Sequence, residues 1–147
     1  MTLSDVNTAV HDILAENFDN YRLYSQARVE NIKRPAFVYF LHPVSMEPSG
    51  RNTRHVVMTL VIDYFQSVKN MPDAENAIIK IRDALGWSFA AGDGYANVTD
   101  FDWSYTGTER NIPEINATLE WFEAVNLEKP ADTMEILQLK TKLKEEV

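Results

Sequence analysis

Two stretches of the chain carry apolar residues at the three- and four-residue spacing of an amphipathic helix. The first stretch covers residues 3–18, and Thr2 or Ser4 can cap its start. Its apolar positions are Leu3, Val6, Val10, Ile13, Leu14 and Phe18. The second stretch covers residues 73–85, between an acidic start that follows a proline and Gly86, which suits a helix end. Its apolar positions are Ala74, Ala77, Ile78, Ile81 and Leu85. The spacing predicts two helices that each bury one face.

The segment between these helices has the composition of strands. A short strand is expected at residues 22–28, and the aromatic and β-branched residues at 36–41 predict a strand buried on both faces. The prolines, Gly50 and polar residues of 43–53 favour a basic connecting loop. Alternation over residues 56–65 places one face of a long strand in the core. That face consists of Val56, Met58, Leu60, Ile62 and Tyr64.

Three more strands are expected after the second helix. Residues 87–90 predict a short strand, and the glycines of residues 91–94 suit a tight hairpin. Alternating apolar and polar residues predict half-buried strands at 101–105 and 115–121, connected by the polar residues 106–113. The order is helix, three strands, helix, three strands. It predicts an α+β fold with a mainly antiparallel or mixed sheet of about six strands and both helices packed on one face.

We expect a single domain over residues 1–130, followed by a C-terminal arm over residues 131–147. Leu137, Leu139 and Leu143 belong to an alternation of apolar and polar residues that runs unbroken for eight positions, which is the period of a strand. Leu139 and Leu143, with Ile136, also lie at helical steps, so a helix stays open. We favour an extended arm, because a terminal strand can pair with the sheet edge of a neighbour.

The charged residues are unevenly distributed along the chain. The 147 residues include 14 Lys and Arg against 22 Asp and Glu, a formal net charge of −8. This balance argues against broad nucleic-acid binding through phosphates. Residues 22–54 hold six basic and two acidic residues, whereas residues 93–123 hold seven acidic residues and one basic residue. Two arrangements stay open. The basic part pairs with the acidic part of an identical neighbour, which closes into rings, or the two parts pair across the sheet of one subunit.

Residue types that carry catalysis are scarce in this sequence. There is no cysteine, and the three histidines are scattered, which removes thiolate ligands and cysteine nucleophiles. Asp100 and Asp102 lie two apart on one strand face, as metal-binding or acid–base carboxylates do. Because no third ligand is in view, a solvated strand face is the favoured interpretation. We expect no catalytic, cofactor-binding or metal site, and a small metal-dependent hydrolase at these two aspartates is the least favoured alternative.

No targeting or membrane-spanning segment is expected. The longest apolar run, residues 56–62, is interrupted by Thr59 and is far shorter than the roughly 18 residues that a membrane span requires. The first residues lack the basic and apolar regions of a secretory signal. These features favour a cytoplasmic protein.

Short segments in a fixed order also carry a resemblance to a known family. They are residues 1–10 (MTLSDVNTAV), 23–25 (LYS), 33–37 (KRPAF), 52–54 (NTR), the strand end 63–65 (DYF) and the late acidic-to-leucine tail. Together they resemble the bacteriophage tail terminator, or tail-completion, family of phages and prophages of Gram-positive bacteria. The resemblance covers nearly the whole chain.

The resemblance implies a structural virion protein and not an enzyme. Its implied role is a hexameric ring at the head-proximal end of the tail tube, which stops tube polymerisation and presents a docking surface to the neck. The implied partners are further copies of the chain, the tail tube protein, a neck or head–tail connector protein and, in a contractile tail, the sheath protein. DNA only passes through the channel. The protein would assemble in the host cytoplasm and reside in the virion tail. A related neck or head-completion protein is the alternative.

The expected interface residues follow from charge and periodicity and not from the resemblance. The basic segment of one subunit is expected to face the acidic segment of the next, and the leucines of the arm are expected to pack on a neighbour. These residues are Arg34, Arg51, Arg54, Asp100, Asp102, Glu109, Leu137, Leu139 and Leu143.

Overall fold

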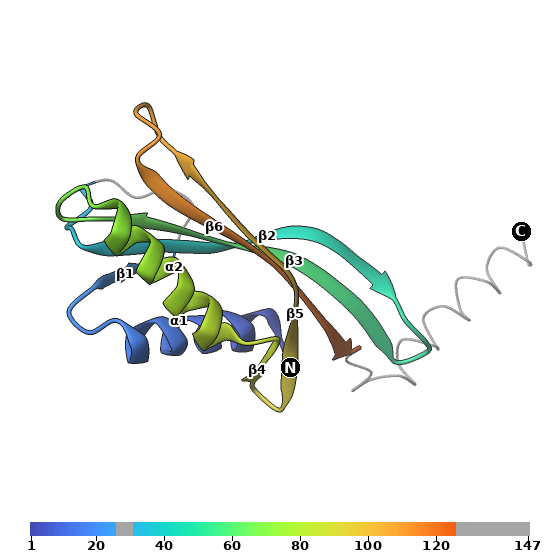
Figure 1. The fold of residues 1–147 in the computed structure, drawn as a ribbon. Coiled ribbons are helices and arrows are strands. Elements are labelled where there is room, and N and C mark those ends of the chain that lie inside the picture. Colours follow the sequence, from blue (N-terminus) through green and yellow to red (C-terminus); the bar gives the residue numbers. More distant parts are fainter. Residues whose placement is uncertain (26–30, 126–147) are drawn as a thin grey trace, which may run out of the picture.

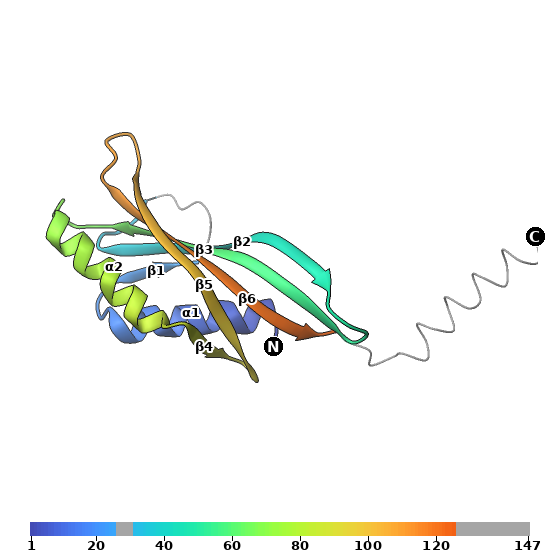
Figure 2. The same cartoon turned by 45° about the vertical axis from the view of Figure 1, so that its right-hand side comes forward.

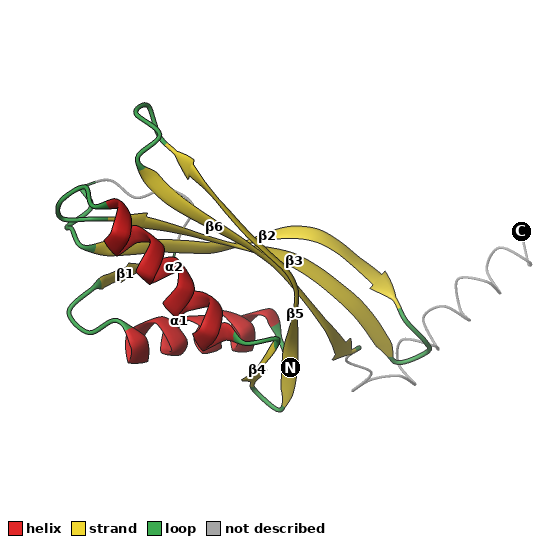
Figure 3. Cartoon of the chain, viewed as in Figure 1, coloured by secondary structure: helices red, strands yellow, loops and turns green. Residues whose placement is uncertain are grey.

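The computed structural model describes residues 1–25 and 31–125, and its element order agrees with the predicted order. A helix and three strands are followed by a second helix and three strands (Figure 1, Figure 3). The elements are α1 (Leu3–Asn17), β1 (Arg22–Tyr24), β2 (Ala36–Pro48), β3 (Thr53–Phe65), α2 (Met71–Leu85), β4 (Ser88–Ala91), β5 (Gly94–Thr106) and β6 (Ile112–Ala124). The expected arm and the second half of the strand expected at 22–28 lie outside the described residues.

The six strands form one mixed, curled sheet in the order β1-β2-β3-β6-β5-β4. The β1–β2 pair is parallel, and all other neighbours are antiparallel. Both helices lie on the same face of the sheet (Figure 1, Figure 2). The predicted α+β class and the one-sided helices are confirmed.

Local sequence explains where both helices begin and end. Thr2 and Asp5 form a capping box, in which the Thr2 hydroxyl accepts from Asp5 N–H and the Asp5 carboxylate accepts from Thr2 N–H. The Asn70 side chain accepts from Asp73 N–H, and this cap starts α2 two residues before the predicted residue 73. Gly86 ends α2 with a φ of 64°. The predicted apolar stripes of both helices face the sheet, except that Leu3 at the start of α1 is exposed.

The core lies between the two helices and the sheet. The face predicted for residues 56–65 is buried there, as is the alternating face of β6. Its largest fully buried side chains include Trp121, Tyr39, Phe37, Leu14, Leu60, Ile62, Ile81, Leu85, Ile115 and Leu119. Burial of this apolar surface is the main stabilising contribution to the fold.

The loop expected at residues 43–53 is wrong. β2 continues through both prolines to Pro48 and pairs with β3 along its whole length, so only a short turn joins the two strands. Proline is tolerated in sheets at edges and bulges. β1 pairs with β2 only as far as Val38, and the register of β2 shifts between Pro43 and Ser45. Over Pro43 and Pro48, β2 therefore pairs with β3 only and carries a bulge, and a strand of this kind tolerates residues that have no N–H to donate.

Candidate assembly surfaces

Two long stretches of sheet edge lack a strand partner among the described residues. On one side, residues 39–48 of β2 extend beyond β1. On the other side, β4 pairs with β5 only as far as Asn97. The Val98 N–H then donates to the Trp87 carbonyl oxygen at 2.8 Å, and residues 99–106 continue as an open edge. Unpaired backbone groups at an edge are a template for a further chain.

A largely apolar groove of about 610 Å³ runs beside the open part of β5. Its walls come from α2, from Trp87 just before β4, and from β5. The lining residues are Glu75, Ile78, Ile79, Arg82, Trp87, Thr99, Asp100, Phe101 and Trp103. Trp87 is 72% exposed and Trp103 is 54% exposed. The Arg82 guanidinium lies 3.9 Å from the Trp87 ring centroid and its Nη1 donates to the Gly86 carbonyl oxygen. Exposed aromatic surface of this kind marks an interaction site.

The exposure of Trp103 contradicts part of the prediction for residues 101–105, which was a half-buried strand. The strand exists, but only Phe101 packs against the core, as a partly buried side chain. The register of β5 shifts between Val98 and Asp100, so a bulge re-aims the residues that follow. This groove was not predicted from the sequence. The sequence signals for it were Trp87, which follows the capping residue Gly86 of α2, and Ile79, beside the buried stripe of α2.

The β2–β3 hairpin projects beyond the helices to form a separate tip (Figure 1). Arg51 is exposed in its turn. The Arg54 Nε lies 2.7 Å from Oε2 of Glu123, whose side chain is buried and also accepts from the Trp121 Nε1. The Val125 N–H donates to the Asn52 carbonyl oxygen at 2.8 Å. The chain therefore leaves the described fold at this tip.

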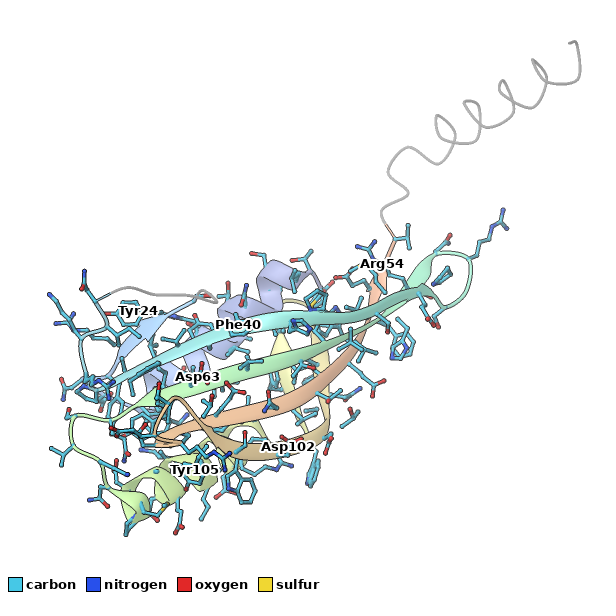
Figure 4. All side chains as sticks on the ribbon, turned by 90° about the horizontal axis from the view of Figure 1, so that it is seen from above. Tyr24, Phe40, Arg54, Asp63, Asp102 and Tyr105 are labelled. Carbon is cyan, nitrogen blue, oxygen red and sulfur yellow. The ribbon has the colours of Figure 1, made fainter. Side chains whose placement is uncertain are left out.

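The predicted interface residues that the structure describes fall into four places: Arg34 before β2, Arg51 and Arg54 at the β2–β3 tip, Asp100 and Asp102 on β5, and Glu109 in the β5–β6 turn. Arg34 precedes β2 and Arg51 follows it, so a 13-residue strand of about 40 Å separates them. Asp102 lies on β5, which β6 separates from the β3 strand of Arg54, and the two side chains lie far apart (Figure 4). Leu137, Leu139 and Leu143 lie outside the described residues, as does any contact they make. The pairing of Arg54 with Glu123 is intramolecular, which is the second arrangement that the charge distribution left open.

The described residues give little support for chemistry at the paired aspartates. Asp100 and Asp102 are exposed, and one Asp100 oxygen accepts from the Phe101 N–H at 2.9 Å. Within residues 1–25 and 31–125, no three His, Cys, Asp or Glu side chains gather closely enough to hold a metal ion. No helix over the same residues has the length and hydropathy to cross a membrane.

A pair of carboxyl groups that was not predicted from the sequence lies on the sheet face away from the helices. Asp63 on β3 stands opposite Glu114 on β6 (Asp63 is labelled in Figure 4). Burial, followed by the hydrogen bond to Glu114 and the Glu114 charge, raises the pKa of Asp63 from 3.8 to about 7. One Asp63 oxygen has no hydrogen-bond partner within the described residues. An acidic residue inside an otherwise apolar strand was the available signal.

Replacing Asp63 with Asn is expected to stabilise the protein at neutral pH. The folded state holds the Asp63 proton up to about pH 7, while an unfolded aspartate releases it near pH 3.8. The folded state binds more protons in between, so stability falls as pH rises through this window. Because solvent screens the partly open site, we expect a gain of about 1–2 kcal/mol at pH 8 and almost none at pH 4. Thermal melts across this range measure it, with Asp102→Asn as control, and a flat difference between pH 4 and 8 refutes it.

Comparisons with known proteins give one family and one fold. A family model described as "Phage tail terminator protein" matches residues 5–131. One solved structure aligns with a TM-score of 0.53 over 86% of this chain and 97% of its own, at 11% identity, a likeness that concerns the fold alone. No curated protein matches the sequence.

Proposed function

We propose a function from one premise: the chain belongs to the phage tail terminator family, whose model spans residues 5–131. The chain is therefore a structural component of a phage tail. From this premise we propose that copies of it form a closed ring, a hexamer, that caps the head-proximal end of the tail tube and stops its polymerisation. The Gram-positive origin and the boundary between residues 130 and 131 stay predictions.

The observation that carries the ring is the pair of open edges on one sheet. β2 and β5 lie on opposite sides of the sheet order, and each continues past its outer neighbour. Two different patches on opposite sides of a subunit favour a head-to-tail contact, which closes into a ring when the rotation permits. A symmetric two-fold contact would use the same patch twice.

The proposed contact joins the β2–β3 tip of one subunit to the β5–β6 turn of the next. The tip begins where the open part of β2 ends at Pro48, and the turn begins where the open part of β5 ends at Thr106. The tip presents Arg51, and the turn presents Glu109 from the acidic part of the chain. Arg110, also exposed in this turn, directly follows Glu109, so the proposed contact depends on Arg51 approaching the Glu109 carboxylate and not on the net charge of the turn. Arg54 contributes less in this proposal, because it is already paired with Glu123 in its own subunit.

The proposed termination is steric. One ring face matches the last ring of the tube, and the other face offers a different surface, so the next tube subunit finds no complementary patch. That outer face docks a neck or head–tail connector protein and, in a contractile tail, the end of the sheath. The formal net charge of −8 disfavours adhesion of DNA that passes through the channel. The protein acts in this proposal without catalysis.

Purified full-length protein added to polymerising tail tubes is expected to cap them. Electron microscopy should show rings at one tube end and a shorter mean tube length than in the untreated sample. Free rings that never bind a tube, with tube lengths unchanged, would refute the capping role and favour a neck protein. Monomers under assembly conditions would refute the ring.

Charge reversal tests the proposed contact. Arg51→Glu and Glu109→Lys should each raise the subunit concentration for half-assembly about tenfold, since each puts like charges opposite one another. The double variant in one chain should restore assembly, because every contact again joins opposite charges. Lys69→Glu, an exposed site between β3 and α2, controls for net charge. Mass photometry measures the ring fraction, and two unaffected single variants would rule this contact out.

A further inference from the structure

The open part of β5 differs from the other free edge of the sheet in what it offers a partner. Residues 99–106 contain no proline, whereas the open part of β2 contains Pro43 and Pro48. An edge without proline can donate and accept along its whole length. The apolar groove with its exposed Trp103 lies beside this edge. The β5 edge is therefore the better template for an added strand.

The two faces of β5 along this edge are chemically distinct. Phe101 and Trp103 line the groove on the side of α2, and Thr99 and Asp100 join them there at the bulge. Side chains alternate along a strand, so Asp102 and Ser104 point to the opposite face. A strand added here would meet aromatic surface on one face and acidic or polar side chains on the other.

The C-terminal segment of the chain has the matching alternation. Residues 137–144 carry Leu137, Leu139 and Leu143 at one parity and Lys140, Lys142 and Lys144 at the other. Their length, eight residues, equals that of the open stretch 99–106. In an added strand the leucines would face the groove, and the lysines would lie on the opposite face, which bears Asp102.

The departure point of the chain brings the β5 edge of the next subunit within reach in the proposed ring. The subunit's own β5 edge, which begins where Asp100 pairs with Thr118, is also within reach, so disulfide trapping distinguishes the two edges. Val125 is bonded to Asn52 at the β2–β3 tip, and 22 residues follow it. In the proposed ring this tip lies against the β5–β6 turn of the next subunit, and Thr106, the end of the open edge, adjoins that turn. Residues 126–136 can span roughly 35 Å when extended, enough to enter the neighbouring edge.

We propose that residues 137–144 of one subunit add as a strand to the open edge of β5 in the neighbouring subunit, with the leucines on the groove. This inference rests on the proposed ring. The added strand closes the edge, covers Trp103 and links each subunit to the next by main-chain hydrogen bonds.

Disulfide trapping tests this placement. Because the chain has no cysteine of its own, every disulfide must join two introduced cysteines. One full-length chain carries Asp102→Cys, and a differently tagged co-expressed chain carries Lys140→Cys, Thr141→Cys, Lys142→Cys or Lys144→Cys. A disulfide between the two tags is intermolecular by construction. In the control, Ser67→Cys replaces Asp102→Cys in the first chain. Because thiols that face one another have a high effective concentration, we expect about tenfold more mixed disulfide than in this control at one or two of the lysine positions. Thr141 alternates with the lysines and would lie on the opposite face of the added strand, so Thr141→Cys should give no more mixed disulfide than the control.

Each other outcome overturns the inference. Mixed disulfide no higher than in the Ser67→Cys control excludes the neighbouring edge. An intrachain disulfide in the single chain that carries both cysteines, without a mixed one, assigns the segment to its own subunit. The mass of the unsubstituted chain separates the two proposals. A monomer refutes the ring itself, whereas a ring without the mixed disulfide refutes only the position of residues 137–144.

Discussion

Trp121→Ala is expected to destabilise the subunit by about 3–5 kcal/mol, the range for removing a large aromatic side chain from a core. Trp121 is 1% exposed and is the largest fully buried side chain. Its Nε1 also donates to the Glu123 carboxylate at 3.3 Å, so the substitution leaves a cavity and removes one partner of a buried charge. A loss of this size is a large part of the stability of a single domain. Chemical denaturation measures it, and assembly should fail in parallel.

Phe122→Ala is the matched control for this prediction. Phe122 is the next residue on the same strand, but it is 58% exposed and stacks only on His55. We expect its loss to cost less than about 1 kcal/mol. Equal losses for the two variants would mean that β6 is not buried on the face described.

Gly92→Ala is expected to cost about 2–3 kcal/mol, from backbone strain together with loss of a helix cap. Gly92 has a φ of 58°, which disfavours any side chain. A Cβ there would lie 2.6 Å from Oδ2 of Asp5. That oxygen accepts from the Thr2 N–H in the capping box of α1, so Asp5 cannot move away without opening the cap. A lower melting temperature with reduced helical signal is the expected readout.

Gly94→Ala provides the comparison within the same hairpin. Gly94 is not in the left-handed region, and a Cβ there would have Met1 atoms at 3.6 Å, an ordinary contact. We expect a change within about 0.5 kcal/mol. If Gly94→Ala were as damaging as Gly92→Ala, general intolerance of the hairpin, and not the contact with Asp5, would be the cause.

The periodicity of the sequence predicted the order of the elements and most of their buried faces, but it missed the second half of β2 and the exposure of Trp103. The stripe from Ala74 to Leu85 and the alternation from Val56 to Tyr64 are both buried as predicted. These patterns are reliable because a helix or strand with one apolar face must bury that face whatever it packs against. The family was also recognisable from short segments in order, and the family model agrees.

Only the tertiary structure decided which segments are neighbours. The pairing of β3 with β6 brings Arg54 to Glu123 and Asp63 to Glu114, across more than fifty residues of sequence in each case. Alternation in the sequence predicts which side chains are buried, but it does not predict which strand pairs with which. The open edges also depend on which strands are neighbours. Pro43 in the sequence favours a loop, yet β2 tolerates it because β1 ends before it and leaves that edge unpaired. Trp103 is exposed for a related reason, since β4 and the core end before they reach it.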